Sequence, residues 1–87
     1  MNPSQWPRTV DAAVTILMAK LSKEHKAEIR GMKKDDLADG CHDLGIHIRN
    51  QFGLLRNKPL LEDTGKKLDP DGAVMAITET LWRRLQR

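Results

Sequence analysis

Cysteine is almost absent from this sequence, since its 87 residues include only Cys41. A single cysteine cannot form an internal disulfide. The sequence also has no apolar signal at its N-terminus and no apolar run of about 20 residues, the length that spans a bilayer. We therefore expect a soluble, cytoplasmic chain with no disulfide framework and no membrane partner.

Aromatic residues are also scarce, because tyrosine is missing and the chain contains only Trp6, Phe52 and Trp82. Leucine, isoleucine, valine, methionine and alanine must supply most of the core, and this composition suits helices better than sheets. A chain of this length buries only about 60 to 65% of its unfolded surface, so a partner or a homodimer would add to a small stability. We expect one all-α domain over residues 1–87, with three main helices, one or two short helices, and an extended N-terminal arm over residues 1–8.

The stretch from Asp35 to Phe52 has the apolar spacing of a helix that buries one face. Its apolar stripe consists of Leu37, Cys41, Leu44, Ile48 and Phe52. Gly53 follows where a left-handed C-terminal cap needs glycine. Gly40 and Gly45 flank the stripe, which indicates the close approach either of a neighbouring helix or of a ligand. We expect this to be the central helix, with the last helix packed beside it.

Residues that commonly cap helix N-termini precede the other helices. Thr9 precedes a helix that runs to about Leu21, Ser22 precedes a short charged helix that ends near Gly31, and Asp69 precedes the last helix. Pro70 then occupies the first position of the last helix, where proline is favoured. Trp6 is the residue large enough to anchor the N-terminal arm.

The net charge of +3 lies entirely in the second half of the chain. Residues 1–44 carry seven basic and seven acidic side chains, whereas residues 45–87 carry eight basic and five acidic ones. The basic residues of the second half are Arg49, Arg56, Lys58, Lys66, Lys67, Arg83, Arg84 and Arg87. This excess is compatible with a nucleic-acid or acidic protein partner, but it favours a solvated surface whose cations suit the C-terminus of the last helix.

The spacing of the histidines and the cysteine argues against metal binding and nucleophilic catalysis. His42 and His47 lie about 140° apart round a helix, so they cannot bind one ion from one face. Asp39, His42 and Asp43 share a face, but a metal site in a helical bundle needs a second such set. Cys41 belongs to the apolar stripe, where free cysteine behaves as a small hydrophobic residue. We predict no metal, no cofactor and no catalytic residue.

One flank of the central helix carries a polar set with two interpretations. His42, Gly45 and Arg49 follow one another in steps of three and four, and Arg49 beside the apolar stripe requires a carboxylate such as Asp69 or Asp71. The first interpretation is a structural polar clasp, in which the side chain of Asn50 bonds the loop backbone; its members are Arg49, Asn50, Asp69 and Asp71. The second is an enzyme-like site for an anion or phosphate at His42, Arg49 and Asn50.

At these residues the sequence resembles a family of small bacterial and phage domains that has no assigned biochemical function. The resemblance covers almost the whole chain and rests on Trp6, Pro7 and Thr9; His42, Leu44, Gly45, Ile48, Arg49, Asn50, Phe52, Gly53 and Leu54; Asn57 with Leu60 or Leu61; Asp71 and Ala73; and Leu81, Trp82 and Leu85. The family pattern has a tryptophan where this chain has Leu55. If that tryptophan forms a recognition surface, the surface is altered in this chain, and if it is a core residue, leucine fills less volume and its neighbours must repack. The resemblance implies a setting in a bacterial cell or a phage-infected host.

These observations favour a non-enzymatic protein-interaction module, such as a phage or prophage accessory factor or inhibitor that acts on a host protein. The alternatives are a nucleic-acid-binding protein that uses the basic C-terminal half, and an enzyme-like protein that uses the anion site. The candidate binding residues are His42, Arg49, Asn50, Arg56, Arg83 and Arg84.

Overall fold

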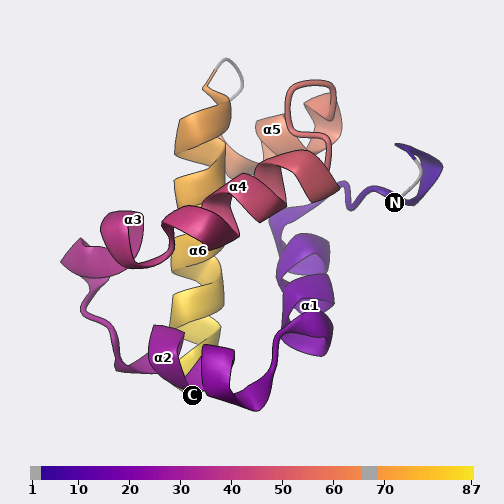
Figure 1. Ribbon diagram of the computed structural model, residues 1–87. Coiled ribbons are helices and arrows are strands. Elements are labelled where there is room, and N and C mark those ends of the chain that lie inside the picture. The colour runs from indigo at the N-terminus through magenta and orange to yellow at the C-terminus, as the bar shows by residue number, and fades with distance from the viewer. Residues whose placement is uncertain (1–2, 66–68) are drawn as a thin grey trace.

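The computed structural model describes residues 3–65 and 69–87, and all of their regular secondary structure is helical (Figure 1). The elements are a 3-10 helix η1 (Pro3–Gln5), α1 (Val10–Lys20), α2 (Lys23–Gly31), a 3-10 helix η2 (Lys34–Asp36), α3 (Leu37–Gly40), α4 (His42–Gln51), α5 (Lys58–Thr64) and α6 (Pro70–Leu85). No strand occurs in the described ranges, so the all-α prediction is confirmed. Two of the basic residues of the second half, Lys66 and Lys67, lie outside these ranges.

The predicted N-caps are confirmed at three helices. The Thr9 hydroxyl accepts the backbone N–H of Ala12 at 3.1 Å, and the Ser22 hydroxyl accepts that of His25 at 3.1 Å. The Asp69 carboxylate accepts the N–H of Gly72 at 3.0 Å. Each bond satisfies one of the N–H groups that the first turn of a helix leaves free. Local sequence therefore fixes where α1, α2 and α6 begin.

The prediction of a single helix over Asp35–Phe52 is wrong, because the chain forms η2, α3 and α4 there. The break is at Cys41, whose backbone φ of −113° and ψ of 26° are not helical. The apolar stripe itself is confirmed, since all five of its members are buried: Leu37, Cys41, Leu44, Ile48 and Phe52. The chain changes direction at this one non-helical residue, but the apolar face stays in the core on both sides of it. As a result, α3 and α4 both contact α6.

The two glycines of this stretch are explained by close approach from two different sources. A Cβ on Gly45 would lie 3.1 Å from a methyl group of Val74, so α6 is the neighbouring helix there. A Cβ on Gly40 would lie 2.7 Å from the sulfur of Met32, which is a side chain from the segment after α2. Gly40 also has low helix propensity, and the helix breaks at the residue that follows it.

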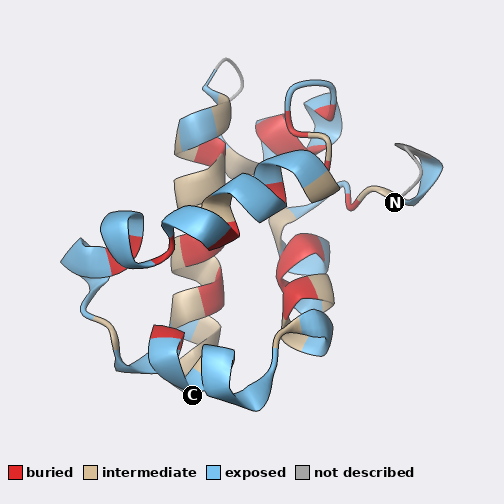
Figure 2. Ribbon diagram, viewed as in Figure 1, coloured by how far each residue is buried: buried red, intermediate tan, exposed pale blue. Residues whose placement is uncertain are grey.

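The central helix of the fold is α6, not the helix predicted from the apolar stripe. α6 contacts each of the other five α-helices, and α4 crosses in front of it (Figure 1). Buried residues lie on the sides of α1, α4 and α6 that face one another (Figure 2). α6 is the longest helix and has partly buried residues beside its buried stripe, so it can contact neighbours in several directions. The prediction failed because a well-defined stripe shows that a helix is buried on one side, not that it is central.

Candidate functional site

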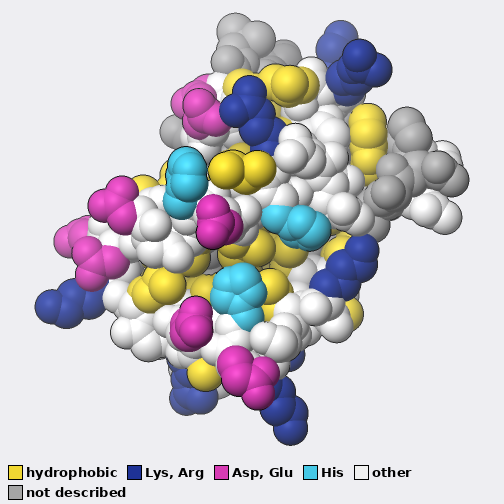
Figure 3. All heavy atoms as spheres, in the orientation of Figure 1, with side chains coloured by type: hydrophobic (Ala, Val, Ile, Leu, Met, Phe, Trp, Pro, Cys, Tyr) yellow, Lys and Arg dark blue, Asp and Glu magenta, His cyan; other side chains and the backbone are white. Residues whose placement is uncertain are grey.

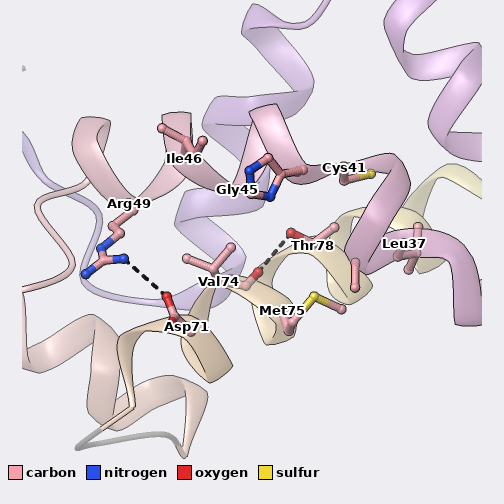
Figure 4. A pocket seen from close by; sticks show the side chains of 11 residues that line it. Leu37, Cys41, Gly45, Ile46, Arg49, Asp71, Val74, Met75 and Thr78 are labelled. Atoms are coloured by element: carbon pink, nitrogen blue, oxygen red, sulfur yellow. Dashed lines mark hydrogen bonds and ion pairs between the residues drawn. The ribbon is translucent and has the colours of Figure 1, made fainter.

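A cleft of about 200 Å³ lies between α4 and α6 (Figure 4). Its lining is mainly apolar, with polar groups at the rim: Leu37, Ala38, Cys41, His42, Gly45, Ile46, Arg49, Asp71, Val74, Met75 and Thr78. Ile46 is half exposed, at 50% of its full surface. Hydrophobic side chains reach the molecular surface over α4 and below it, among histidine and acidic side chains (Figure 3). We call this feature the α4–α6 cleft.

The helical spacing places His42, Gly45 and Arg49 together along the cleft. Arg49 donates to the carboxylate of Asp71 at 3.3 Å, and the two side chains keep 43% and 85% of their exposure. The Arg49 side chain is thus partly buried while Asp71 is exposed, and an ion pair this exposed contributes only about 0 to 1 kcal/mol. The pair therefore marks the rim of the cleft and adds little stability to the fold.

The predicted clasp is assembled only in part: Arg49 pairs with Asp71 as expected, whereas Asn50 and Asp69 do not join the pair. Asn50 is exposed and does not line the cleft, since one residue along a helix turns the side chain by about 100° from that of Arg49. Asp69 is the N-cap of α6, so its bond is made to the backbone of its own helix. The anion set is divided between two depressions: His42 and Arg49 line the α4–α6 cleft, whereas Asn50 lines a separate hollow that it shares with Arg49 but not with His42.

Asn57 forms a buried polar junction between the N-terminal arm, the end of α4 and the start of α5. From the sequence, it was not predicted to have this role. Its side chain is nearly inaccessible, at 4%, and its Nδ2 donates to the backbone oxygens of Pro7 at 2.9 Å and Phe52 at 3.0 Å. Its Oδ1 accepts the N–H of Leu60 at 3.3 Å and so caps α5. The signal was present, because an asparagine just before Lys58 and Pro59 marks a helix start.

Cys41 contributes a buried sulfur to the floor of the cleft. Its Sγ lies 3.7 Å from the Met32 sulfur, and burial raises the pKa of the thiol. A raised pKa leaves little thiolate at neutral pH, and the thiolate is the nucleophilic form. The side chain is therefore suited to packing rather than to catalysis.

We expect a thiol reagent at pH 7 to react with the folded protein at least about tenfold more slowly than with the urea-unfolded chain. Stability should also fall as the pH rises above the ordinary thiol value of 9.0, because the unfolded chain then loses a proton that the folded state retains. Labelling kinetics and urea titrations at several pH values measure both effects. Cys41→Ala should remove this part of the pH dependence, and rapid labelling of the native protein would contradict the assignment.

A second surface surrounds Trp6 at the C-terminal end of α4. Its members are Trp6, Arg8, Arg49, Leu55 and Arg56, and we call it the Trp6 surface. The indole lies against Gly53, whose φ of +56° confirms the predicted left-handed cap. Leu55 is 67% exposed, and Asn50 lies at the edge.

One of the two adjacent arginines at the C-terminal end of α6 makes contacts within the fold. Arg84 donates to the hydroxyl of Thr15 at 3.1 Å and to the carboxylate of Asp11, so it ties α6 to α1. Arg83 is exposed, and it makes no side-chain bond or ion pair with the residues that the structure describes. Of these two candidate nucleic-acid contacts, only Arg83 therefore has a guanidinium that is not already used within the fold.

No group of three or more histidine, cysteine, aspartate or glutamate side chains within the described ranges is arranged to hold a metal ion. None of the helices in residues 3–65 and 69–87 combines the length and apolar character needed to cross a membrane.

The chain belongs to the family described as "Domain of unknown function (DUF6794)", which matches residues 6–85. The match includes both the α4–α6 cleft and the Trp6 surface. No curated protein and no solved structure matches the chain.

Proposed function

We propose that this member of a family without an assigned function is a non-enzymatic protein-interaction module that binds another protein along α4. The observation that carries the proposal is the α4–α6 cleft, which stays open beside the half-exposed Ile46. Sequence reasoning missed Ile46, although an isoleucine outside the buried stripe of α4 was the available signal. Apolar contact centres with polar rims are typical of protein interfaces.

The size and the chemistry of the cleft favour a protein segment over a small substrate. Its volume of about 200 Å³ is below the roughly 300 to 1,000 Å³ typical of ligand pockets, but it suits the insertion of a single side chain. Arg49 is already neutralised by Asp71, which weakens the alternative of an anion site. The protonated Cys41 thiol offers no nucleophile. The occupant that we propose is an apolar side chain of a partner protein.

The resemblance in sequence extends the proposal to a bacterial cell or a phage-infected host. There the chain would act in the cytoplasm as an accessory factor or inhibitor that covers a surface of a host protein. A single domain of this size has enough surface for one standard interface of about 800 Å² per partner. A homodimer through the same face is the competing outcome.

We expect Ile46→Asp to weaken partner binding by at least about tenfold, because a charge at the centre of an apolar contact must be desolvated. A photo-crosslinker at position 46 should identify the partner, and calorimetry on the purified pair should measure the affinity. Ala12→Asp introduces the same charge at an exposed position of α1 and should leave the affinity unchanged. Gel filtration distinguishes a homodimer, which would replace the host partner in this proposal.

Two results would contradict the proposal. The first is an unchanged affinity in Ile46→Asp, because the cleft would then not be the contact. The second is capture of nucleic acid alone, lost as the salt concentration rises, which would favour the nucleic-acid alternative.

A further inference from the structure

We infer that the partner presents an acidic segment, and that this segment binds across the Trp6 surface with an apolar side chain against Trp6 and Leu55. The inference rests on the proposed function and assigns the chemistry of the partner. It is carried by the arrangement of one indole, one exposed leucine and two arginines, Arg8 and Arg56, that have no acidic partner among the described residues.

The indole of Trp6 packs against Gly53 and is bordered by two hollows. A Cβ on Gly53 would overlap the ring, so the ring packs directly on the backbone of the α4 cap. A hollow of about 370 Å³ is lined by Trp6, Arg8, Arg56, Asn57 and Pro59. A second, of about 270 Å³, is lined by Trp6, Arg49, Asn50, Gly53, Leu55 and Arg56. Both hollows include the indole and Arg56, so an extended segment can run from one to the other past the ring.

The charged side chains that line the two hollows are all basic. No acidic side chain among the described residues lines either hollow. The ion pairs within residues 3–65 and 69–87 are Arg49 with Asp71 and Arg84 with Asp11, so Arg8 and Arg56 have no acidic partner in that part of the chain. An arginine guanidinium can bind a carboxylate through two parallel hydrogen bonds. A segment with carboxylates on both sides of an apolar residue complements this arrangement.

Leu55 favours a protein segment over single-stranded nucleic acid. Single-stranded nucleic acids stack successive bases on several aromatic side chains, whereas Trp6 is the one aromatic residue of this surface. Leu55 is 67% exposed, and an apolar side chain of a peptide would remove it from water. Tryptophan and arginine are also the residues most enriched among the strongest contacts of protein interfaces.

Arg49 connects the two surfaces, because it lines both the α4–α6 cleft and a hollow of the Trp6 surface. A partner anchored in the cleft can therefore continue onto the Trp6 surface without leaving the protein. In this arrangement the cleft provides apolar anchoring, and the arginines increase the association rate and its salt dependence.

The test is selection of a random peptide library on the immobilised full chain, followed by affinity measurements on selected peptides. We expect the selected peptides to be acidic around an apolar residue. Arg56→Glu should weaken their binding by about tenfold or more, because it places a carboxylate opposite the acidic segment. Leu55→Ser should weaken binding by a smaller factor, of about three to ten. Both positions are exposed, so thermal melts should show that the fold is retained.

Arg83→Glu is the matched control, since it makes the same change of charge at an exposed position on α6. Equal losses in Arg56→Glu and Arg83→Glu would overturn the inference, because the effect would then come from net charge. Selected peptides that respond to Ile46→Asp but not to Arg56→Glu would also overturn it, while leaving the proposed function intact. Tighter binding of an oligothymidine probe than of any selected peptide would assign the Trp6 surface to nucleic acid and overturn it as well.

Discussion

Gly53→Ala is expected to destabilise the domain by about 2 to 4 kcal/mol. Two costs add at this position. The backbone φ of +56° disfavours any residue with a Cβ, and the new methyl group would overlap the Trp6 ring. The ring is too large to yield by a small rotation, so it must leave the α4 cap. For a domain of this length, with an expected stability of roughly 4 to 13 kcal/mol, such a loss is a large fraction.

Urea unfolding monitored by circular dichroism measures the loss, and tryptophan fluorescence reports the exposure of the indole. Gly65→Ala is the matched control, because Gly65 also has a positive φ, of +76°, but no atom of residues 3–65 and 69–87 lies within 4 Å of its added Cβ. It should cost only about 1 kcal/mol. Equal losses in the two variants would show that the contact with Trp6 contributes nothing to the effect of Gly53→Ala.

Short-range features of this fold could be predicted from the sequence because they depend on neighbouring residues. Thr9, Ser22 and Asp69 cap their own helices, and each cap bond spans three residues. The apolar stripe of the central stretch was found for the same reason, since helical periodicity repeats within a few turns. Gly53 was recognised as a cap from its position just after the last stripe residue.

Features that depend on contacts distant in sequence were missed. The break at Cys41 adjoins Gly40, which Met32 packs against from the segment after α2. The central position of α6 depends on which helices pack on it, and its own pattern does not specify them. Arg49 and Asp71 do lie together, but the exposure of their ion pair depends on the open cleft beside it. Hydrophobic periodicity identifies buried faces but does not identify what covers them.

Part of the candidate site could be predicted from the sequence, because helical spacing alone places some of its residues on one side of α4. His42, Gly45 and Arg49 share a flank through helical spacing alone, and they line the cleft. Leu55 could not be distinguished from a core residue by type, because it is an apolar residue next to a buried one, and the position of Ile46 outside the stripe did not show that it borders an open cleft. Their exposure is set by the crossing of α4 over α6 and by the turn after Gly53.

Asn57→Ala is expected to destabilise the domain by about 2 to 4 kcal/mol, although it removes only one small side chain. The amide group satisfies the buried oxygens of Pro7 and Phe52 and caps α5 through Leu60. Alanine at this position leaves two carbonyl groups without a donor in a region that water hardly reaches. The N-terminal arm, the end of α4 and the start of α5 would each lose a hydrogen bond to this one side chain. Urea unfolding measures the loss, and hydrogen exchange at Leu60 reports whether the cap is gone.

Asn57→Asp separates the cap from the two donated bonds. The introduced carboxylate keeps an acceptor for Leu60 but cannot donate, and it faces two carbonyl oxygens in a buried position, so the pKa of this carboxyl should be raised. Stability should then be highest at low pH, where the carboxyl is protonated, and should be lost as the pH rises through its folded-state pKa. Asn50→Ala, on the exposed side of α4, should change stability by less than about 0.5 kcal/mol. Comparable losses in Asn50→Ala and Asn57→Ala would contradict the assignment of Asn57 as the buried polar junction. A loss confined to Asn57 would show that one asparagine holds together the segments that carry the Trp6 surface.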